Sequence, residues 1–193
     1  MSRLTKDDIL KIQSAHYQWL INKGGKRAVY TDCTLYDLDL SCFNFDQVKF
    51  SKCKIQDVVM PQEIYKASFK DVRLVDTKFV DSNLIKTRFT NCLCVSSDFT
   101  NAVLEKAKFK RTSIQNCNFT GSNLIDSDLK IYHVGQWAAH ICPDWTSIGC
   151  QSHSNEDWHN FTDEEIDNMA THALAYWKAN KDMIFAIMDS FKK

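Results

Sequence analysis

The sequence predicts a mainly β solenoid with a helical cap at each end, and three observations support this fold class. Between residues 66 and 134 every fifth residue is apolar, beginning with Phe69, Leu74 and Phe79. The residue two positions before each centre is nearly always small, as at Ala67 and Thr77. Helical patterns flank the repeats on both sides. A period of five matches neither the turn of a helix nor the alternation of a strand, so it indicates a coil that turns a corner every five residues.

The first element is a helix within residues 1–27, which we expect to cover one open end of the solenoid. Thr5 and Asp8 form a capping box at its start, and Gly24 and Gly25 can end it. The apolar and aromatic positions between these signals follow helical spacing: Ile9, Ile12, His16, Trp19 and Leu20.

The second element is the solenoid, which we place at residues 28–134 with about five coils. An earlier block of centres runs in a different phase from the later one: Tyr30, Leu35, Leu40, Phe45, Phe50, Ile55 and Met60. The two phases differ by one residue between Met60 and Ile64. Pro61 lies in that interval, and because proline cannot donate to a strand ladder it favours a bulge or corner loop there.

The repeats resemble the pentapeptide-repeat family, in which a small residue, a polar residue, Leu or Phe and two polar residues recur. The resemblance implies a right-handed quadrilateral β-helix with four pentapeptides in each coil and the small and central side chains inside. On two opposite sides it stacks large centres: Phe69, Phe89, Phe109 and Leu129, and Phe79, Phe99 and Phe119. On the other two sides it stacks smaller ones: Leu84, Leu104 and Leu124, and Leu74, Cys94, Ile114 and Val134. A chance fivefold period would not also sort by size from coil to coil.

The resemblance extends to phage and prophage members of the family. Residues 16–28 are similar to the helix that leads into their repeats. Residues 148–154 with Trp158, followed by residues 175–178, are similar to a C-terminal module of such proteins. This implies a phage-encoded protein that acts in the host cell cytoplasm. The module brings no known activity with it.

The third element is a C-terminal cap at residues 135–193, made of an irregular segment and an amphipathic helix. Thr162 and Glu165 form a second capping box, and the helix either continues as one rod or breaks near Asn180. An apolar stripe follows the box: Ile166, Met169, Ala170, Ala173, Leu174, Trp177, Ile184 and Met188. We expect this stripe to pack inside the chain, and it also leaves open a homodimer through this helix.

Composition indicates a cytoplasmic protein. The 193 residues can hold one domain with capping extensions, or two small domains. No apolar run approaches the roughly 18 residues that a membrane span needs, and the N-terminus lacks the apolar core of a signal peptide. Five cysteines fall at inward positions of the repeats, where we expect reduced thiols that pack as small apolar groups: Cys33, Cys53, Cys92, Cys94 and Cys117.

Charge is uneven along the chain although its net value is zero. Residues 26–130 carry 16 basic and 13 acidic side chains, whereas residues 131–193 carry four and nine. The candidate basic surface lies on the side centred on Phe69, Phe89 and Phe109: Lys70, Arg88, Lys108, Lys110, Arg111 and Lys130. It can attract phosphate or an acidic protein, although Asp71 and Asp128 dilute it and a solvated face without a partner is the simpler interpretation.

Two roles in nucleic acid biology are disfavoured by this pattern. No aromatic residues interleave with the basic surface, so we do not expect nucleic acid binding. Some members of the family are DNA mimics that inhibit gyrase, and such mimicry needs a strongly acidic rod. Because this solenoid carries net positive charge, gyrase inhibition stays a minority hypothesis.

The remaining chemistry lies between residues 131 and 161, where the fivefold period is lost. The candidate ligand-binding or partner-binding residues are Trp145, Cys150, His153, Trp158 and His159. They allow a pocket for a small ligand or for an anchor side chain of a protein partner. The simpler interpretation is that these side chains pack the cap onto the last coil.

Two further interpretations of this segment are weaker. Zinc could be held by Cys150 and His153 with Cys142 and one of His140, His159 or His172, but this spacing is less specific than two Cys-x-x-Cys knuckles, so no metal is expected. Cys150 could also be a nucleophile activated by His153 or His159, although the sequence names no orienting residue and no oxyanion element.

We therefore expect a binding protein that is not an enzyme and has no catalytic residues and no cofactor. None of the five glycines forms a phosphate-binding loop, and the acidic residues at 163–165 complement a helix dipole. The function we infer is presentation of a rigid β-helix surface to a macromolecular partner, such as a host enzyme or defence component that the protein inhibits. The alternative is a small-ligand or zinc-binding protein that uses the C-terminal cluster.

Overall fold

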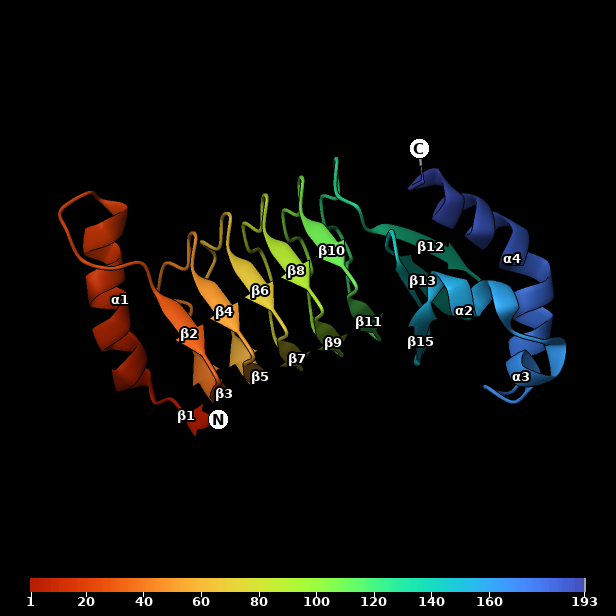
Figure 1. Cartoon of the computed structure of the whole chain (residues 1–193), viewed down its shortest axis with the longest axis horizontal. Coiled ribbons are helices and arrows are strands. Elements are labelled where there is room, and N and C mark those ends of the chain that lie inside the picture. Colours follow the sequence, from red (N-terminus) through yellow and green to blue (C-terminus); the bar gives the residue numbers. More distant parts are fainter. Residues whose placement is uncertain (193) are drawn as a thin grey trace.

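The computed structural model describes residues 1–192, apart from the side chain at position 134, and it arranges an N-terminal helix, a solenoid and a C-terminal cap along one axis (Figure 1). Helix α1 (Lys6–Leu20) lies at one end. A stack of short strands forms the middle, and a cap of strands and three helices forms the other end. Within the described residues no helix combines the length and apolar character that a bilayer-spanning segment requires.

Two parallel sheets run along the solenoid. One contains five strands: β2 (Val29–Thr31), β4 (Lys49–Ser51), β6 (Ser68–Lys70), β8 (Arg88–Thr90) and β10 (Lys108–Lys110). The other contains six: β1 (Ser2–Arg3), β3 (Cys33–Asp39), β5 (Lys54–Val59), β7 (Arg73–Val75), β9 (Leu93–Val95) and β11 (Ser113–Gln115). Single parallel bridges join the coils on the two remaining sides, as at Asn83↔Val103 and Asp98↔Asn118. The chain therefore passes four sides in each turn, as the fivefold period predicts.

The core consists of the predicted ladders of side chains. Phe89 stacks on Phe69 and Phe109 with ring centroids 5.0 and 4.8 Å apart, and Phe99 stacks on Phe79 and Phe119 at 4.8 and 4.7 Å. These spacings equal the distance between neighbouring strands, so each ring lies directly on the ring of the coil before it. Burial of each such ring stabilises the fold by roughly 1.5–3 kcal/mol.

The corners of the coil explain the period of five. A residue with positive φ occurs two positions after almost every centre, as at Asp71, Asp76 and Asp81. One left-handed residue in each pentapeptide turns the chain through a corner, and Asp and Asn tolerate this conformation better than most side chains. Buried hydroxyl groups at the small positions donate to the preceding coil, as from Thr87 Oγ1 to the carbonyl of Ile64 at 2.8 Å.

The change of phase is a coil that is one residue shorter. Glu63 bridges Asn44, 19 positions earlier, and Asn83, 20 positions later. Pro61 is buried at this corner, and its carbonyl accepts a hydrogen bond from Ser82 Oγ at 3.0 Å. The sequence placed the irregularity at the right residues, and the structure shows that it removes a residue from the corner.

Helix α1 closes the first coil through both apolar and polar contacts, and its Ile9 is fully buried in the solenoid core. The capping box of Thr5 and Asp8 is present, and the helix ends at Leu20, before the two glycines. His16 is fully buried; its Nε2 lies 3.0 Å from the carbonyl of Asp46, and its Nδ1 accepts from the backbone N–H of Ala28 at 3.2 Å. His16 therefore joins the helix to the solenoid. Strand β1, which the sequence did not predict, pairs with β3 at the edge of the six-stranded sheet.

The regular solenoid ends earlier than the predicted residue 134. Residues 130–134 form β12 (Lys130–Val134), which pairs antiparallel with β13 (Trp137–Ile141) and therefore does not continue the parallel ladders. The side chain of Val134, predicted to lie on Ile114, is outside the described atoms. The backbone N–H of Ile114 instead donates to Ser147 Oγ at 3.0 Å.

The segment predicted to be irregular is mostly a four-stranded antiparallel sheet. It comprises β12, β13, β14 (Trp145–Ile148) and β15 (Gln151–Ser154). Strand β14 lies beside β11, the last strand of the six-stranded sheet. The antiparallel sheet therefore covers the last coil and protects its strand edge. The turns of the two outer hairpins begin with Gly135 and Gly149, both with positive φ.

Three helices complete the cap: α2 (Asn155–Asn160), α3 (Asp163–Asp167) and α4 (Ala173–Ser190). The Thr162–Glu165 capping box is present, but the predicted helix breaks at residues 168–172 and not near Asn180, which is buried inside α4. Left-handed His172 begins the second helix. Trp177, Ile184 and Met188 of the predicted stripe are buried in the cap, as expected for packing inside the chain, so the apolar face that left open a homodimer is covered within the chain.

All eight cysteines are free thiols. The five at inward positions of the repeats are buried, as predicted, and burial raises the pKa of Cys92 to about 12. Cys142 is also buried, whereas Cys42 and Cys150 are exposed.

Candidate functional site

The predicted basic surface is only partly assembled by the fold. Arg88 and Lys108 are direct partners in the register of β8 and β10, and Lys110 continues the same strand. Lys70 and Lys110 both pair with Thr90, so this one uncharged residue separates them. Lys130 lies in β12 and belongs to a different sheet. Arg111 is at a corner, where its backbone N–H donates to Asp144 of the cap at 2.8 Å.

A more concentrated group of cations lies beside this surface. Together these cations form a hollow of about 430 Å³ that is open to solvent, which we call the basic groove. The groove is lined by Arg27, Gln47, Lys66, Lys86, Arg88, Lys106 and Lys108. No acidic side chain lines it. Only Arg88 and Lys108 of these residues belong to the predicted surface.

The corners of the solenoid place the lysines of the groove. Lys66, Lys86 and Lys106 have φ of 56°, 58° and 57°, so each is the left-handed residue of its pentapeptide. They follow one another in the stack, because the N–H of Lys66 donates to Ile85 O and that of Lys86 donates to Glu105 O. Neighbouring rungs of such a stack are about 4.8 Å apart. The signal was visible in the sequence as three lysines at intervals of 20 residues.

Arg27 closes the groove from the segment between α1 and β2. Its Nε donates to the carbonyl of Gln47, and its guanidinium lies 5.7 Å from the ring centroid of Trp19. Partial burial, and then the nearby Arg88, lower the pKa of Arg27. Arg27 was not part of the predicted surface because it precedes the first repeat.

Acidic side chains neutralise the lysines at only one end of the groove. Lys106 pairs with Glu105 at 2.8 Å and with Asp126 at 3.9 Å, and Lys108 lies 3.9 Å from Asp128. Among residues 1–192 no acidic side chain forms an ion pair with Arg27, Lys66, Lys86 or Arg88. The end of the groove near α1 therefore keeps its positive charge.

Tyr65 reports the local potential. The ammonium of Lys66 lies 4.7 Å from the centroid of the Tyr65 ring. Hydrogen bonding to the Lys66 ammonium, and then the charges of Lys66 and Lys86, lower the pKa of the Tyr65 phenol, because each favours the phenolate. This is the effect expected beside a patch of uncompensated positive charge.

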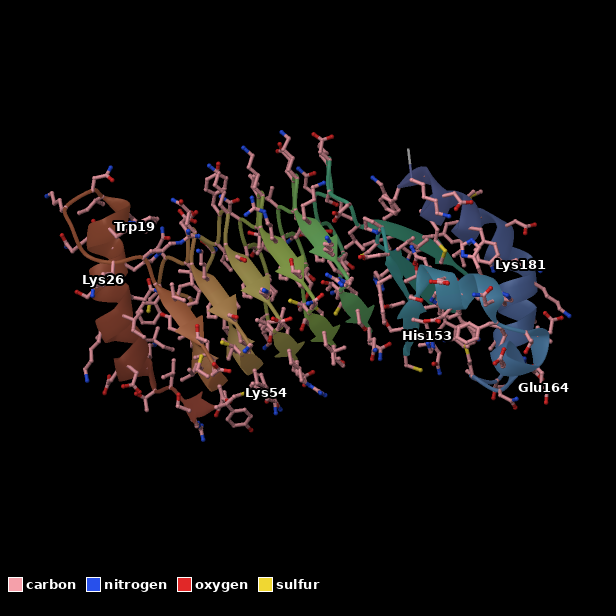
Figure 2. The ribbon with its side chains drawn as sticks, viewed as in Figure 1. Trp19, Lys26, Lys54, His153, Glu164 and Lys181 are labelled. Atoms are coloured by element: carbon pink, nitrogen blue, oxygen red, sulfur yellow. The ribbon has the colours of Figure 1, made fainter. Side chains whose placement is uncertain are left out.

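The five candidate residues of the C-terminal segment do not converge on one point, although His153 packs against Trp158. Trp145 donates its indole N–H to Ser152 Oγ at 2.8 Å, next to the interface with β11. His153 lies in the cap (Figure 2). Its ring meets those of Trp158 and Phe161 edge to face, with centroids 5.3 and 4.9 Å apart, and these two rings also contact each other at 5.5 Å. His159 is exposed and stacks on Phe185 at 4.1 Å. Most of these contacts are packing contacts, which favours the simpler interpretation of the cluster.

The weaker zinc and nucleophile interpretations find no geometric support. In the part of the chain that the structure describes, no three or more His, Cys, Asp or Glu side chains are placed to hold a metal ion. Burial raises the pKa of Cys142 well above its ordinary value, which disfavours the thiolate that zinc needs. His153 Nε2 lies 3.3 Å from Gln151 Oε1, and His159 Nδ1 lies 2.6 Å from Asn155 O, so both rings have partners other than Cys150.

Residues 61–119 match a family model described as the pentapeptide repeat region. No curated protein matches the sequence. Among solved structures, a trypsin-treated form of QnrB1, a plasmid-mediated fluoroquinolone resistance protein, aligns with 14% identity and a TM-score of 0.38 over 51% of this chain and 61% of that chain.

Two cyanobacterial structures align over a similar share. HetL of Nostoc sp. strain PCC 7120, a pentapeptide repeat protein involved in heterocyst differentiation regulation, has 20% identity and a TM-score of 0.27 over 53% of this chain and 47% of that chain. Rfr23 of Cyanothece 51142, a pentapeptide repeat protein, has 12% identity and a TM-score of 0.26 over 59% of this chain and 92% of that chain. The alignment therefore spans less than two thirds of QnrB1 and of HetL.

Proposed function

We propose that the protein is a non-catalytic binding protein whose basic groove docks an acidic segment of a protein partner. The proposal rests on the groove itself, because six cationic side chains line this one hollow. One comes from the segment between α1 and β2, and the others come from successive coils. Its end near α1 has no neutralising acid. A partner that supplies carboxylates there would gain ion pairs without displacing existing ones.

The spacing of the groove favours a helical acidic segment. The rungs that carry Lys66, Lys86 and Lys106 are about 4.8 Å apart. Side chains three or four positions apart on a helix lie about 5–6 Å apart, so Asp or Glu residues at such positions can face successive lysines. Sequence-independent binding of single-stranded nucleic acid combines cations with stacking platforms, and no aromatic side chain lines the groove.

The charge of the groove also bears on DNA mimicry. A DNA mimic presents negative charge to its target, whereas the basic groove is lined mainly by lysine and arginine. Gyrase inhibition by mimicry therefore stays the weaker hypothesis. A host enzyme or defence component, inhibited by a phage-encoded protein, remains the partner that we propose from the family resemblance.

The test compares two triple variants in a quantitative capture from bacterial lysate. The first variant replaces Lys66, Lys86 and Lys106 with Glu. The matched control makes the same change at Lys52, Arg73 and Lys78, which are exposed cations outside the groove. Both change the net charge equally, so any difference between them reports the groove.

We expect a near-stoichiometric partner to be lost in the groove variant and retained by the control. Three exposed ion pairs at about 0.5 kcal/mol each predict at least tenfold weaker binding. Circular dichroism establishes that both variants are folded. Equal capture by the two variants would contradict the proposal, and so would capture of nucleic acid as the main bound species.

A further inference from the structure

Helix α1 has a second apolar side that is not covered by the described part of the chain. The helix packs on the first coil through Ile9 and His16, which are buried. Three large apolar side chains on another side are exposed to solvent: Leu10 by 57%, Tyr17 by 58% and Ile21, which follows the last residue of the helix, by 38%. Figure 1 shows α1 as the outermost element at its end of the molecule, so another molecule can reach this side.

These side chains belong to a row with the spacing of a coiled coil. Asp7, Leu10, Ser14, Tyr17 and Ile21 follow one another at intervals of three and four residues. That spacing places them on one side of the helix, and two helices that pack side by side meet through such positions. We call these five residues the α1 seam. Ser14 is small and exposed, so the centre of the seam has room for a large side chain of a second helix.

Opposite charges lie at the two ends of the α1 seam. Asp7 is in the first turn of the helix, and Lys23 is exposed just after its end. Within residues 1–192 neither side chain forms an ion pair. A helix rises 1.5 Å per residue, so the two charges are roughly 20 Å apart and cannot neutralise each other in one copy. In an antiparallel pair of such helices, each charge lies beside its opposite on the second copy.

We propose that α1 pairs antiparallel with α1 of a second copy of this chain and forms a two-fold symmetric dimer. In this arrangement Leu10 faces Ile21 of the second copy, and the small Ser14 faces Tyr17. Asp7 then approaches Lys23 at both ends of the contact. Because the same surface is used on both copies, the assembly closes at two subunits. The contact is independent of the basic groove, since no residue of the α1 seam lines that groove.

The exposed area of the α1 seam sets the strength of the dimer. With roughly 200 Å² for a large side chain, the exposed parts of Leu10, Tyr17 and Ile21 amount to roughly 300 Å² on each copy. An apolar patch of this size is common on functional surfaces of monomers. It is smaller than the roughly 800 Å² that each partner contributes to a standard stable interface. We therefore expect a reversible dimer with a dissociation constant on the order of 10–100 μM.

The first test is sedimentation equilibrium of the purified full chain at concentrations between about 1 and 500 μM, which bracket the expected dissociation constant. Tyr17→Glu places a charge in the α1 seam. The matched control is Met183→Glu, which makes the same change at an exposed apolar position of α4 in the cap. We expect Tyr17→Glu to raise the dissociation constant at least tenfold and the control to leave it unchanged. A native chain that stays monomeric throughout, or an equal effect of the two variants, would overturn the proposal.

A charge exchange tests the antiparallel direction and leaves the apolar residues of the α1 seam in place. Asp7→Lys and Lys23→Glu each bring like charges together at both ends of the contact, so each alone should weaken the dimer about fivefold at low salt. The double variant restores opposite charges and should bind within about twofold of the native chain. Circular dichroism establishes that all three variants are folded. A double variant that dimerises no better than the single ones would rule out the antiparallel pairing.

Discussion

Mild acid is expected to destabilise the junction between the solenoid and the cap, because His140 is buried there in its neutral form. His140 lies in β13 and is 6% exposed, with its ring 5.4 Å from that of Phe119 in the last coil. Its Nδ1 has no hydrogen-bond partner among the described residues. Burial, and then the nearby His133, lower the pKa of His140 from its ordinary value of 6.5 to about 4.

The size of the effect follows from this shift. Because the folded-state pKa is lower than the unfolded one, the unfolded chain binds the proton first as the pH falls. Stability from neutral His140 is fully present above pH 6.5 and is lost progressively down to pH 4. At about 1.36 kcal/mol for each pH unit, the loss reaches about 2 kcal/mol near pH 5 and about 3 kcal/mol near pH 4.

The assay is urea unfolding, followed by tryptophan fluorescence, at a series of pH values between about 7.5 and 4.5, where carboxylates also begin to titrate. The His140→Leu variant is the comparison, since it removes only this titration and leaves the shift of His16 and those of the carboxylates in place. Subtracting the two curves isolates His140. Equal pH dependence in the two proteins would refute the reasoning, because it would mean that His140 is accessible to protons in the folded state.

Three further predictions test the core, the N-terminal cap and the thiols. Phe89→Ala should lower the free energy of unfolding by about 4 kcal/mol, which is at least about 1 kcal/mol more than the loss from Phe119→Ala. The reason is that Phe89 is stacked between two rings, whereas Phe119 is the last ring of its ladder. Equal losses for the two variants in urea unfolding would argue against the ladders. Gly25→Ala should lower the free energy of unfolding by at least about 2 kcal/mol, since the new Cβ would lie 2.1 Å from Ala15 O. Gly24→Ala, whose Cβ would have no atom within 4 Å, should lower it by only about 1 kcal/mol. Thermal unfolding distinguishes the two variants, and equal shifts in Tm would count against the close contact between Gly25 and α1. A thiol reagent should modify two of the eight cysteines in the native protein and all eight in urea, and rapid native modification of a third would show that the solenoid opens.

The repeats could be predicted from the sequence because two periods coincide in them, one of five residues and one of 20 residues. The spacing of five places one left-handed corner in each pentapeptide, and the size of the centres then pairs Phe89 with Phe69 and Phe109. The capping boxes of Thr5 and Thr162 could also be predicted from the sequence, since each depends on two residues three positions apart.

The cap could not be predicted in the same way. Its strands are short, and the hairpin turns begin with Gly135 and Gly149 in sequences that lack the usual Asn-Gly or Asp-Gly signal, so the segment appeared irregular. His153 and His159 were read as potential ligands because they are close in sequence. Their rings instead pack on different aromatic neighbours, which only the tertiary structure specifies.

The basic groove was missed for a geometric reason. The predicted basic surface lies around the side centred on the Phe89 ladder, whereas Lys66 and Lys86 occupy the adjacent corner. Arg27 comes from outside the repeats altogether. The sequence pattern that indicates the groove is one lysine at the same corner position in three successive coils: Lys66, Lys86 and Lys106.

The most direct test of the proposed function is the salt dependence of partner binding. Once a partner has been captured, its dissociation constant is measured at several salt concentrations for the native protein and for the triple Glu variant at Lys66, Lys86 and Lys106. If the groove carries the interaction, the native protein binds at least tenfold more tightly at low salt, and the difference narrows as salt screens the charges. The same affinity and the same salt dependence in both proteins would contradict a role for the groove.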